Sequence, residues 1–506
     1  MSKVFLLYTN FFAVRYMHAY QPTKLKLNHC FVEDMEIVYQ QPHIDREIES
    51  LKERIHPPRV CIDNDSCRNC TVVKIDRANK HGILLEMVQA LTDLDLIISK
   101  SYISSDGGWL MDVFHVKDQI GNKLTDKSLV NHIEQILCEC TAKSNGETSS
   151  ETVQHCCKGP QEANVAIEVI GTDRPGLFSE ISVVLMDLGF NIISAKAWTH
   201  NDKVVCIIYP EDASRPGPIN ERERLAQVVD QIRNVIEANE GKGDKDMRSV
   251  VLKSSTTGHS HTERRLHQMM YAASDYESCH ACHGDNDSEH KRQYDGTHVS
   301  VDRYQGRDYW VVNVRSRDRP KLLFDIVCML TDMQYEVFHA AVTSNSPMAE
   351  QEYFIRNQGS SNLDNETEKQ RLTLCLIAAI ECRASHGLKV DIRTQNKMGL
   401  LSKVTQVIHE NGLSITRIEF GVEGEAAIGS LYVTGCSGQD VNENIVELIK
   451  REIGGSIVLA QSSPYRDSQS SSSSNNSRDV IPTFSFGGMI RSHLERLINN
   501  FRPIRS

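Results

Sequence analysis

The chain has 506 residues, which at roughly 150 residues per domain predicts about three to four domains rather than one compact core. An apolar fraction of 40% and a charged fraction of 24% lie near the globular norm and exclude a fibrous or mainly disordered chain. The net charge of −11 disfavours non-specific binding to nucleic acid, and no apolar run approaches the roughly 20 residues that a membrane-spanning helix needs.

The N-terminal part, residues 1–71, is predicted as a partly disordered extension. Its apolar stretch from Val4 to Met17 is interrupted by Arg15, and no small-residue cleavage site follows, which disfavours a signal peptide. The chain contains 15 cysteines, an odd number, scattered without the dense spacing of a secreted disulfide scaffold. We therefore expect reduced thiols in a cytoplasmic or nuclear protein.

Four segments repeat one pattern: an apolar strand, a turn that starts with Asp or Asn followed by Arg or Lys, and a helical run. The second copy has the turn Asp173-Arg174-Pro175-Gly176-Leu177 after the strand Val165 to Ile170. The corresponding turns begin at Asn79, Asp318 and Asn396 and reach Gly82, Lys321 and Gly399. The third copy therefore has lysine where the other three have glycine.

The residues after each turn have the same spacing in all four copies. Counted from the glycine position, offsets 2, 5 and 9 are apolar, which places them on one face of a helix. Offsets 14 and 16 are apolar again with a more polar residue between them in three copies, which indicates a half-buried strand. A third strand and a second helix follow. Copies two and four then have a last strand, at Val250–Lys253 and Ile457–Ala460, and copies one and three have no convincing one.

This order of elements, βαββαβ, predicts a tandem array of ferredoxin-like units of the α+β class, each with its helices on one face of an antiparallel sheet. Such a unit has an open sheet edge, and pairing units edge to edge would cover it. The predicted domains are residues 72–150, 164–254, 308–385 and 387–461, with a His- and Cys-containing linker at 255–307. Cuts by a protease in this linker and in 462–479 should leave two stable halves.

The turn from Asp173 to Leu177 resembles the signature of ACT domains, small regulatory modules that bind amino acids or similar metabolites. Four tandem copies without an attached catalytic domain resemble the plant ACT-domain-repeat (ACR) proteins, over roughly residues 72–461. Similar turns occur in the sensory part of bacterial uridylyltransferases that report glutamine, whose catalytic portion has no visible counterpart in this sequence. The resemblance implies a ligand at the interface between paired units, against the turn between first strand and first helix.

The residues of the turn suit an amino acid. A helix N-terminus presents unpaired N–H groups to a carboxylate, and Gly82, Gly176 and Gly399 let the backbone approach a ligand closely. The side chains of Asn79, Asp173 and Asn396 could accept hydrogen bonds from an ammonium group. In the third copy Lys321 puts a bulky cation at the entrance, so we expect a structural role there. The alternative for all of these residues is structural, because Asp or Asn commonly caps a helix and glycine commonly fills a turn.

Other motifs do not indicate catalysis or a cofactor. The sequence contains no P-loop, no dinucleotide fingerprint and no nucleophile elbow. Two Cys-x-x-Cys pairs are compatible with zinc, one in the linker with His280 and His283 beside it and one at Cys67 and Cys70, but neither has a second pair at a regular spacing. His115 lies in a predicted strand, where a structural histidine is the ordinary interpretation. We predict no metal site, no cofactor and no enzymatic activity.

The C-terminal part consists of a Ser-rich linker at 462–479 and a basic tail at 480–506. Ile490, Leu494, Leu497 and Ile498 have helical spacing among several arginines. This pattern is typical of an amphipathic helix that contacts a membrane surface, docks on a partner or folds back on the repeats.

Taken together, these patterns predict a non-catalytic regulatory or sensor protein that binds a free amino acid or similar metabolite and changes its contacts with an unknown protein partner, without nucleic acid. The alternative is a scaffold for protein–protein interaction that has no small-molecule ligand.

Overall fold

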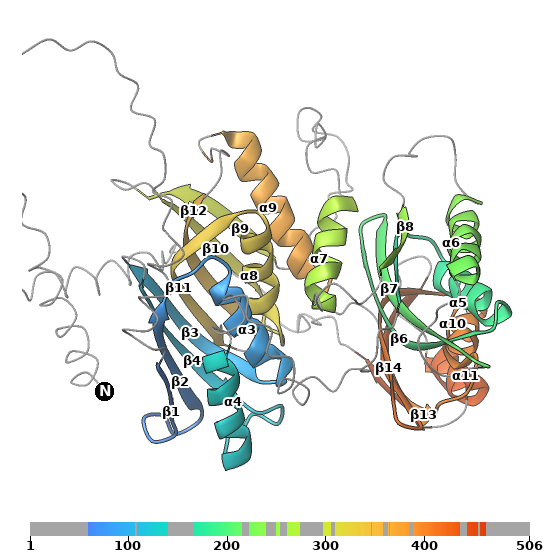
Figure 1. The fold of residues 1–506 in the computed structure, drawn as a ribbon, viewed down its shortest axis with the longest axis horizontal. Helices are drawn as coiled ribbons and strands as arrows, with labels where there is room; N and C mark the ends of the chain where they lie inside the picture. Colours follow the sequence, from blue (N-terminus) through green and yellow to red (C-terminus); the bar gives the residue numbers. More distant parts are fainter. Residues whose placement is uncertain are drawn as a thin grey trace, which may run out of the picture. The chain divides into compact units, whose positions relative to one another are not determined.

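The computed structural model describes residues 59–106, 109–139, 165–214, 222–238, 249–253, 261–273, 297–304, 309–345, 347–357, 363, 365–383, 388–435, 443–453 and 456–461. Their strands form two eight-stranded sheets, in each of which every pair of neighbouring strands is antiparallel (Figure 1). Among these residues no helix is both long and apolar enough to span a membrane.

The first sheet joins copy one with copy three. Its strands lie in the order β1 (Arg59–Asp63), β2 (Thr71–Ala78), β4 (Trp109–Lys117), β3 (Ile97–Asp106), β11 (Tyr335–Asn345), β12 (Met348–Asn357), β10 (Trp310–Arg317) and β9 (His298–Arg303). The second sheet joins copy two with copy four. Its order is β16 (Ser456–Gln461), β13 (Leu388–Gln395), β15 (Ala426–Gly435), β14 (Leu413–Glu423), β6 (Phe190–His200), β7 (Lys203–Asp212), β5 (Ala166–Thr172) and β8 (Ser249–Lys253).

The copies meet at the strand that follows the first helix of each. Strand β3 pairs with β11, with Tyr102 opposite Ala341, and β6 pairs with β14, with Lys196 opposite Glu419. This pairing confirms the ferredoxin-like α+β class and the edge-to-edge joining of units. Consecutive copies lie in different sheets, so a cut between copies two and three divides both sheets. The pairing therefore contradicts the expectation that protease cuts in 255–307 and 462–479 leave two separate stable halves.

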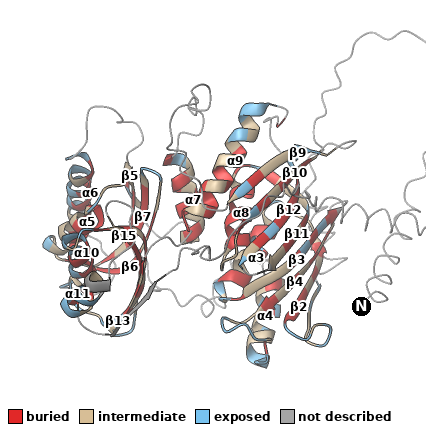
Figure 2. Ribbon diagram, turned by 180° about the vertical axis from the view of Figure 1, so that it is seen from behind, coloured by how far each residue is buried: buried red, intermediate tan, exposed pale blue. Residues whose placement is uncertain are grey.

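Each sheet is covered by four helices that share one core with it. The first core contains residues of α3 (Ile83–Asp93), α4 (Lys127–Glu139), α8 (Leu322–Asp332) and α9 (Glu366–Glu381), and the second contains residues of α5 (Leu177–Asp187), α6 (Arg222–Glu237), α10 (Leu400–Glu410) and α11 (Glu443–Ile453). The predicted apolar stripe is buried in all four first helices, for example at Met87, Ile181, Ile326 and Val404. Buried positions alternate along β4, which gives this strand one core-facing side (Figure 2).

The edge strands missing from copies one and three come from upstream of those copies. Strand β1 pairs antiparallel with β2, and β9 pairs antiparallel with β10, in the same position that β8 and β16 occupy in the other copies. In all four copies the edge strand runs antiparallel to the first strand of the unit. A strand that precedes the unit in the sequence can therefore occupy the edge position as well as a strand that follows it. Strand β1 lies within 1–71 and β9 within 255–307, and both stretches were therefore wrongly predicted to lie wholly outside the domains.

The predicted linker also contains helix α7 (Thr262–Ala273). Its residues Leu266, Met269 and Met270 are buried against Trp198 and Ile207 of the second sheet. The sequence did not predict this helix, because its apolar positions lie among many polar residues. The remaining predictions on residues 1–58, the His and Cys residues near 279–283, the Ser-rich linker and the basic tail lie outside the described residues.

Candidate functional site

All four first helices begin at a residue in the left-handed backbone conformation. The φ angles are 79° at Gly82, 83° at Gly176, 66° at Lys321 and 71° at Gly399. Glycine adopts this conformation without strain, whereas a side chain such as that of Lys321 makes it costly. The residue at the left-handed position caps its helix without a side-chain hydrogen bond in each case. The predicted Asn or Asp lies three residues earlier, before the turn.

In the second sheet, the turn of each copy faces the first helix of the other copy. A Cβ atom added to Gly176 would lie 2.8 Å from the His409 ring on α10, and one added to Gly399 would lie 2.7 Å from Met186 Sδ on α5. Met186 and His409 both come ten residues after their own glycine, so the two contacts are related by a pseudo-twofold axis. The structure thus brings the two glycine turns to the interface between paired copies.

A small cavity lies at the Gly176 end of this interface. It is lined from both copies, by Arg174, Gly176, Phe178, Ser179, Thr405, Ile408, His409, Leu413 and Ile415. Its volume is about 10 Å³, which is room for about one water molecule. His409 forms part of the wall and is exposed to solvent, so rotation of its ring would enlarge the cavity.

Asp173 and Arg174, the two polar residues of the second-copy turn, differ from each other in their surroundings. The backbone N–H of Asp173 donates to the carbonyl of Asp202 at 2.8 Å, and burial raises the pKa of the Asp173 carboxyl to about 6. Arg174 donates to both carboxylate oxygens of Glu180 at 2.6 Å and to the carbonyl of Val235 at 3.1 Å. The arginine therefore ties the turn to both helices of its own copy, whereas the carboxyl of Asp173 is held in a poorly solvated position.

Asn396 takes the same position in the fourth copy. Its backbone N–H donates to the carbonyl of Glu425 at 2.7 Å. Its side-chain Oδ1 is buried and accepts no hydrogen bond from any described residue. A buried acceptor without a donor is costly, so this atom is suited to a donor supplied by water or by a ligand.

In the first sheet the turns are built differently. Asn79 donates to Ser105 Oγ at 2.7 Å and, across the interface, to Glu336 Oε1 at 3.1 Å, so its side chain joins copies one and three. A Cβ atom on Gly82 would meet nothing within 4 Å. The residue ten positions after Lys321 is Thr331, a smaller side chain than Met186 or His409. The ammonium of Lys321 donates to Glu263 on α7 at 2.8 Å.

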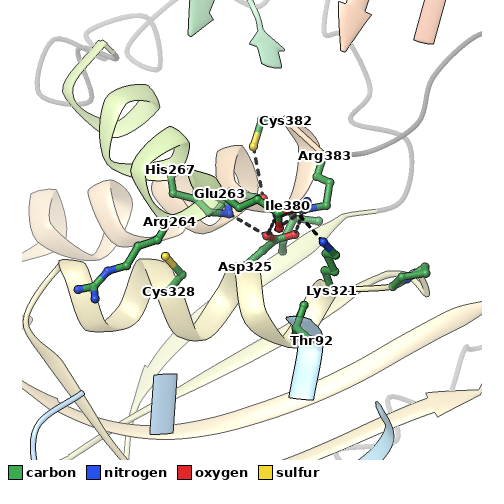
Figure 3. Close-up of polar contacts among 12 residues, drawn as sticks. Thr92, Glu263, Arg264, His267, Lys321, Asp325, Cys328, Ile380, Cys382 and Arg383 are labelled. Carbon is green, nitrogen blue, oxygen red and sulfur yellow. Dashed lines mark hydrogen bonds and ion pairs between the residues drawn. The ribbon is translucent and has the colours of Figure 1, made fainter. Parts of the chain in front are cut away.

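Lys321 belongs to a buried cluster of charges that we call the α7 ion cluster, composed of Glu263, His267, Lys321, Asp325 and Arg383 (Figure 3). Arg383 follows α9 and donates to Asp325 Oδ2 at 2.8 Å and to Glu263 Oε2 at 2.9 Å. Its guanidinium also lies 4.7 Å from the centre of the Trp198 ring on β6. The cluster thus connects α7, the helices of copy three and a strand of the second sheet.

The two carboxylates of the cluster stay ionised despite their burial. Burial alone would raise the pKa of Glu263, but Arg383, Lys196 and Lys321 outweigh it and lower that pKa well below its usual value. Arg383 and Arg319 have the same effect on the pKa of Asp325, and His267 Nε2 lies 2.8 Å from its Oδ1. The sequence did not indicate this cluster, because its members come from distant parts of copy three and from the segment predicted as a linker.

Alanine substitution of the turn glycines should have unequal effects on stability. Gly82→Ala adds a methyl group in open space and should cost about 1 kcal/mol from left-handed strain alone. Gly176→Ala has the same strain and also collides with the His409 ring, so it should cost about 2 kcal/mol or more. Urea unfolding measures both values. Equal losses in the two variants would mean that His409 does not pack on the Gly176 turn.

Comparison with known proteins agrees with the repeat pattern. The model of the ACR family N-terminal ACT domain matches residues 66–144, and the ACT domain model matches residues 165–237. The chain is 48% identical to the ACT domain-containing protein ACR1 of Arabidopsis thaliana, over 93% of this chain and 100% of that protein. It is 44% identical to ACR3 of the same organism, over 83% and 90% of the two chains. A bifunctional uridylyltransferase/uridylyl-removing enzyme of Azospirillum brasilense is 38% identical over 86 residues, which is 9% of that enzyme.

Proposed function

Because the chain belongs to the ACR family of ACT domain-containing proteins, a family of regulatory rather than catalytic proteins, we propose that it binds a free amino acid or similar metabolite between copies two and four. The observation that carries this proposal is the cavity at the Gly176 turn, which residues of both copies line. The first residues of α5 lie beside this cavity, because Gly176, Phe178 and Ser179 line it, and the N–H groups and positive dipole end of a helix N-terminus would favour a ligand carboxylate there.

The surroundings of the cavity suit the other end of an amino acid. Asp173 is an anion in a poorly solvated position, and its half-buried carboxylate would gain from a cationic partner. Asn396, at the matching turn of copy four, has a buried Oδ1 that lacks a donor among the described residues. The turn of copy two thus supplies N–H donors for a carboxylate and, at Asp173, an acceptor for an ammonium group. The turn of copy four lies near Met186 at the other end of α5, roughly 15 Å away along the helix, so Asn396 would serve a second, equivalent site.

The small cavity makes ligand binding a conformational event. An amino acid is several times larger than a water molecule, so His409 has to leave its contact with Gly176 before the ligand enters. Movement of His409 changes the packing of α10 on α5, and those helices belong to different copies. A ligand that favours one arrangement of the two helices would thereby report its presence to a partner protein.

We place this function in the cytoplasm or nucleus, with the basic tail at 480–506 as the contact to a membrane surface or partner.

The scaffold alternative uses the same interfaces without a ligand. In that case the interface between α5 and α10 stays closed, and added amino acids change neither the packing nor the thermal stability of the chain. Saturable binding of an amino acid separates the two functions.

Ligand affinity should fall as the pH is lowered through about 6. Burial raises the pKa of Asp173 to about 6, so the carboxyl becomes protonated below that pH and can no longer pair with an ammonium group. Asp173→Asn should weaken binding about 10-fold to 150-fold at pH 7.5, the equivalent of about 1.5 to 3 kcal/mol, and should flatten the pH dependence. Calorimetric titration with free amino acids at pH 7.5 and pH 5.5 measures both effects.

Two controls make this experiment specific. Asp202→Asn changes a neighbouring side chain that is 73% exposed and should leave affinity unchanged. His409→Gln removes the imidazole that lines the cavity, so a pH dependence that persists in this variant does not come from His409. If Asp173→Asn binds amino acids as the parent does at both pH values, Asp173 does not contact the ligand.

A further inference from the structure

Two cysteines and a histidine meet beside the edge strand of copy one. Cys67 and Cys70 lie in the loop between β1 and β2, and His115 lies on β4. The two Sγ atoms are 2.9 Å apart, and Cys70 Sγ is 3.3 Å from His115 Nδ1. The three donor atoms all lie within 4.8 Å of one another. The structure thus supplies the third group that the Cys67 and Cys70 pair lacks in the sequence.

The sheet register explains why residues so far apart in sequence meet. Cys70 immediately precedes β2, and Val72 of β2 lies opposite His115 of β4. Cys67 is three residues upstream, within the turn that reverses the chain between β1 and β2. The loop therefore brings both sulfur atoms to the imidazole that β4 holds in place.

The donor set identifies the class of ligand. Two thiolates and one imidazole are soft to borderline donors, which favour zinc, whereas magnesium and calcium favour oxygen. Two thiolates also neutralise the charge of a divalent ion. Within the described part of the chain, no fourth His, Cys, Asp or Glu joins the group, so water or an added ligand completes a four-coordinate ion.

We propose that Cys67, Cys70 and His115 bind a zinc ion that fastens the loop between β1 and β2 to β4. Strand β1 is the short upstream strand that takes the place of a missing C-terminal strand, and much of the loop behind it is exposed. A metal that cross-links the loop to β4 stabilises this edge of the sheet. Sulfur atoms bound at about 2.3 Å to a tetrahedral zinc lie about 3.8 Å apart, so the two sulfurs separate by about 1 Å on binding.

Zinc content and cysteine protection test this proposal on the intact chain. Because Cys279 and Cys282 also form a Cys-x-x-Cys pair, the parent for the test is the double variant Cys279→Ser/Cys282→Ser. After dialysis with a reductant and zinc, elemental analysis should find about one zinc per chain in this parent and in Cys61→Ser, whose thiol is exposed and outside the group. Cys67→Ser, Cys70→Ser and His115→Gln should each lose that ion.

A second measurement needs no substitution of Cys67, Cys70 or His115. In the parent, zinc should protect Cys67 and Cys70 from alkylation, as read by peptide mass, while Cys61 reacts at the same rate with and without zinc. Cobalt in place of zinc should give the thiolate-to-metal charge-transfer band of a sulfur-ligated ion. Absence of bound zinc and of protection in the folded parent would overturn the proposal. Recovery of Cys67 and Cys70 as a disulfide after zinc treatment would overturn it in favour of a redox pair.

Discussion

Replacing Arg383 with alanine should lower the free energy of unfolding by about 3 to 5 kcal/mol. Arg383 is 2% exposed and donates to the carboxylates of both Glu263 and Asp325, which are themselves buried. Without the guanidinium these two anions lose their central partner, and the remaining cations around them are Lys196, Lys321 and Arg319. The loss also removes the contact with the Trp198 ring that joins the segment after α9 to the second sheet.

Urea unfolding followed by circular dichroism measures this effect, with Arg233→Ala as the matched control. Arg233 forms an exposed pair with Asp230, so its loss should change stability by less than about 0.5 kcal/mol. A double variant, Arg383→Met/Asp325→Leu, should recover part of the stability because it removes a buried anion together with its partner. A loss of less than about 1 kcal/mol in Arg383→Ala would show that the cluster does not hold α7 to copy three.

A chain cut once between residues 274 and 296 should remain a single particle under native conditions. The cut leaves copies one and two on one fragment and copies three and four on the other, but β3 pairs with β11 and β6 pairs with β14. Each sheet therefore contains strands of both fragments, and separation would expose two long sheet edges and open both cores.

An inserted protease site provides the cut, and native mass spectrometry compared with a denaturing gel measures the result. We expect one species of full mass under native conditions and two fragments in denaturant. Fragments that separate spontaneously and stay folded would contradict the pairing of copy one with three and of copy two with four. They would instead indicate that consecutive copies pair.

The elements of each copy could be predicted from the sequence, because apolar residues recur at helical or strand spacing wherever one face is buried. The choice of partner could not, since every copy has a similar open edge. One difference in the sequence does separate the two pairs of copies. The residue ten positions after the left-handed residue of the turn is threonine in copies one and three, and Met186 or His409 in copies two and four. Strand β1 could not be predicted from the sequence, because it is five residues long and begins and ends with charged residues.

The glycine positions of the candidate site could also be predicted, because left-handed turns favour glycine. Their surroundings depend on contacts between distant parts of the chain. The His409 ring over Gly176 and the pairing of Lys321 with Glu263 on α7 both arise from tertiary packing. Local spacing holds no information on such contacts, so the sequence led us to describe Lys321 only as an obstacle at the entrance of the third turn.

Calorimetric titration of the intact chain with each free proteinogenic amino acid tests the proposed function most directly. We predict saturable heat for at least one amino acid at pH 7.5, and loss of that heat when Asp173 and Asn396 are both replaced by alanine in a chain that circular dichroism shows to be folded. Absence of saturable heat for every amino acid, with the parent chain folded, would contradict the proposal and leave the scaffold function in its place.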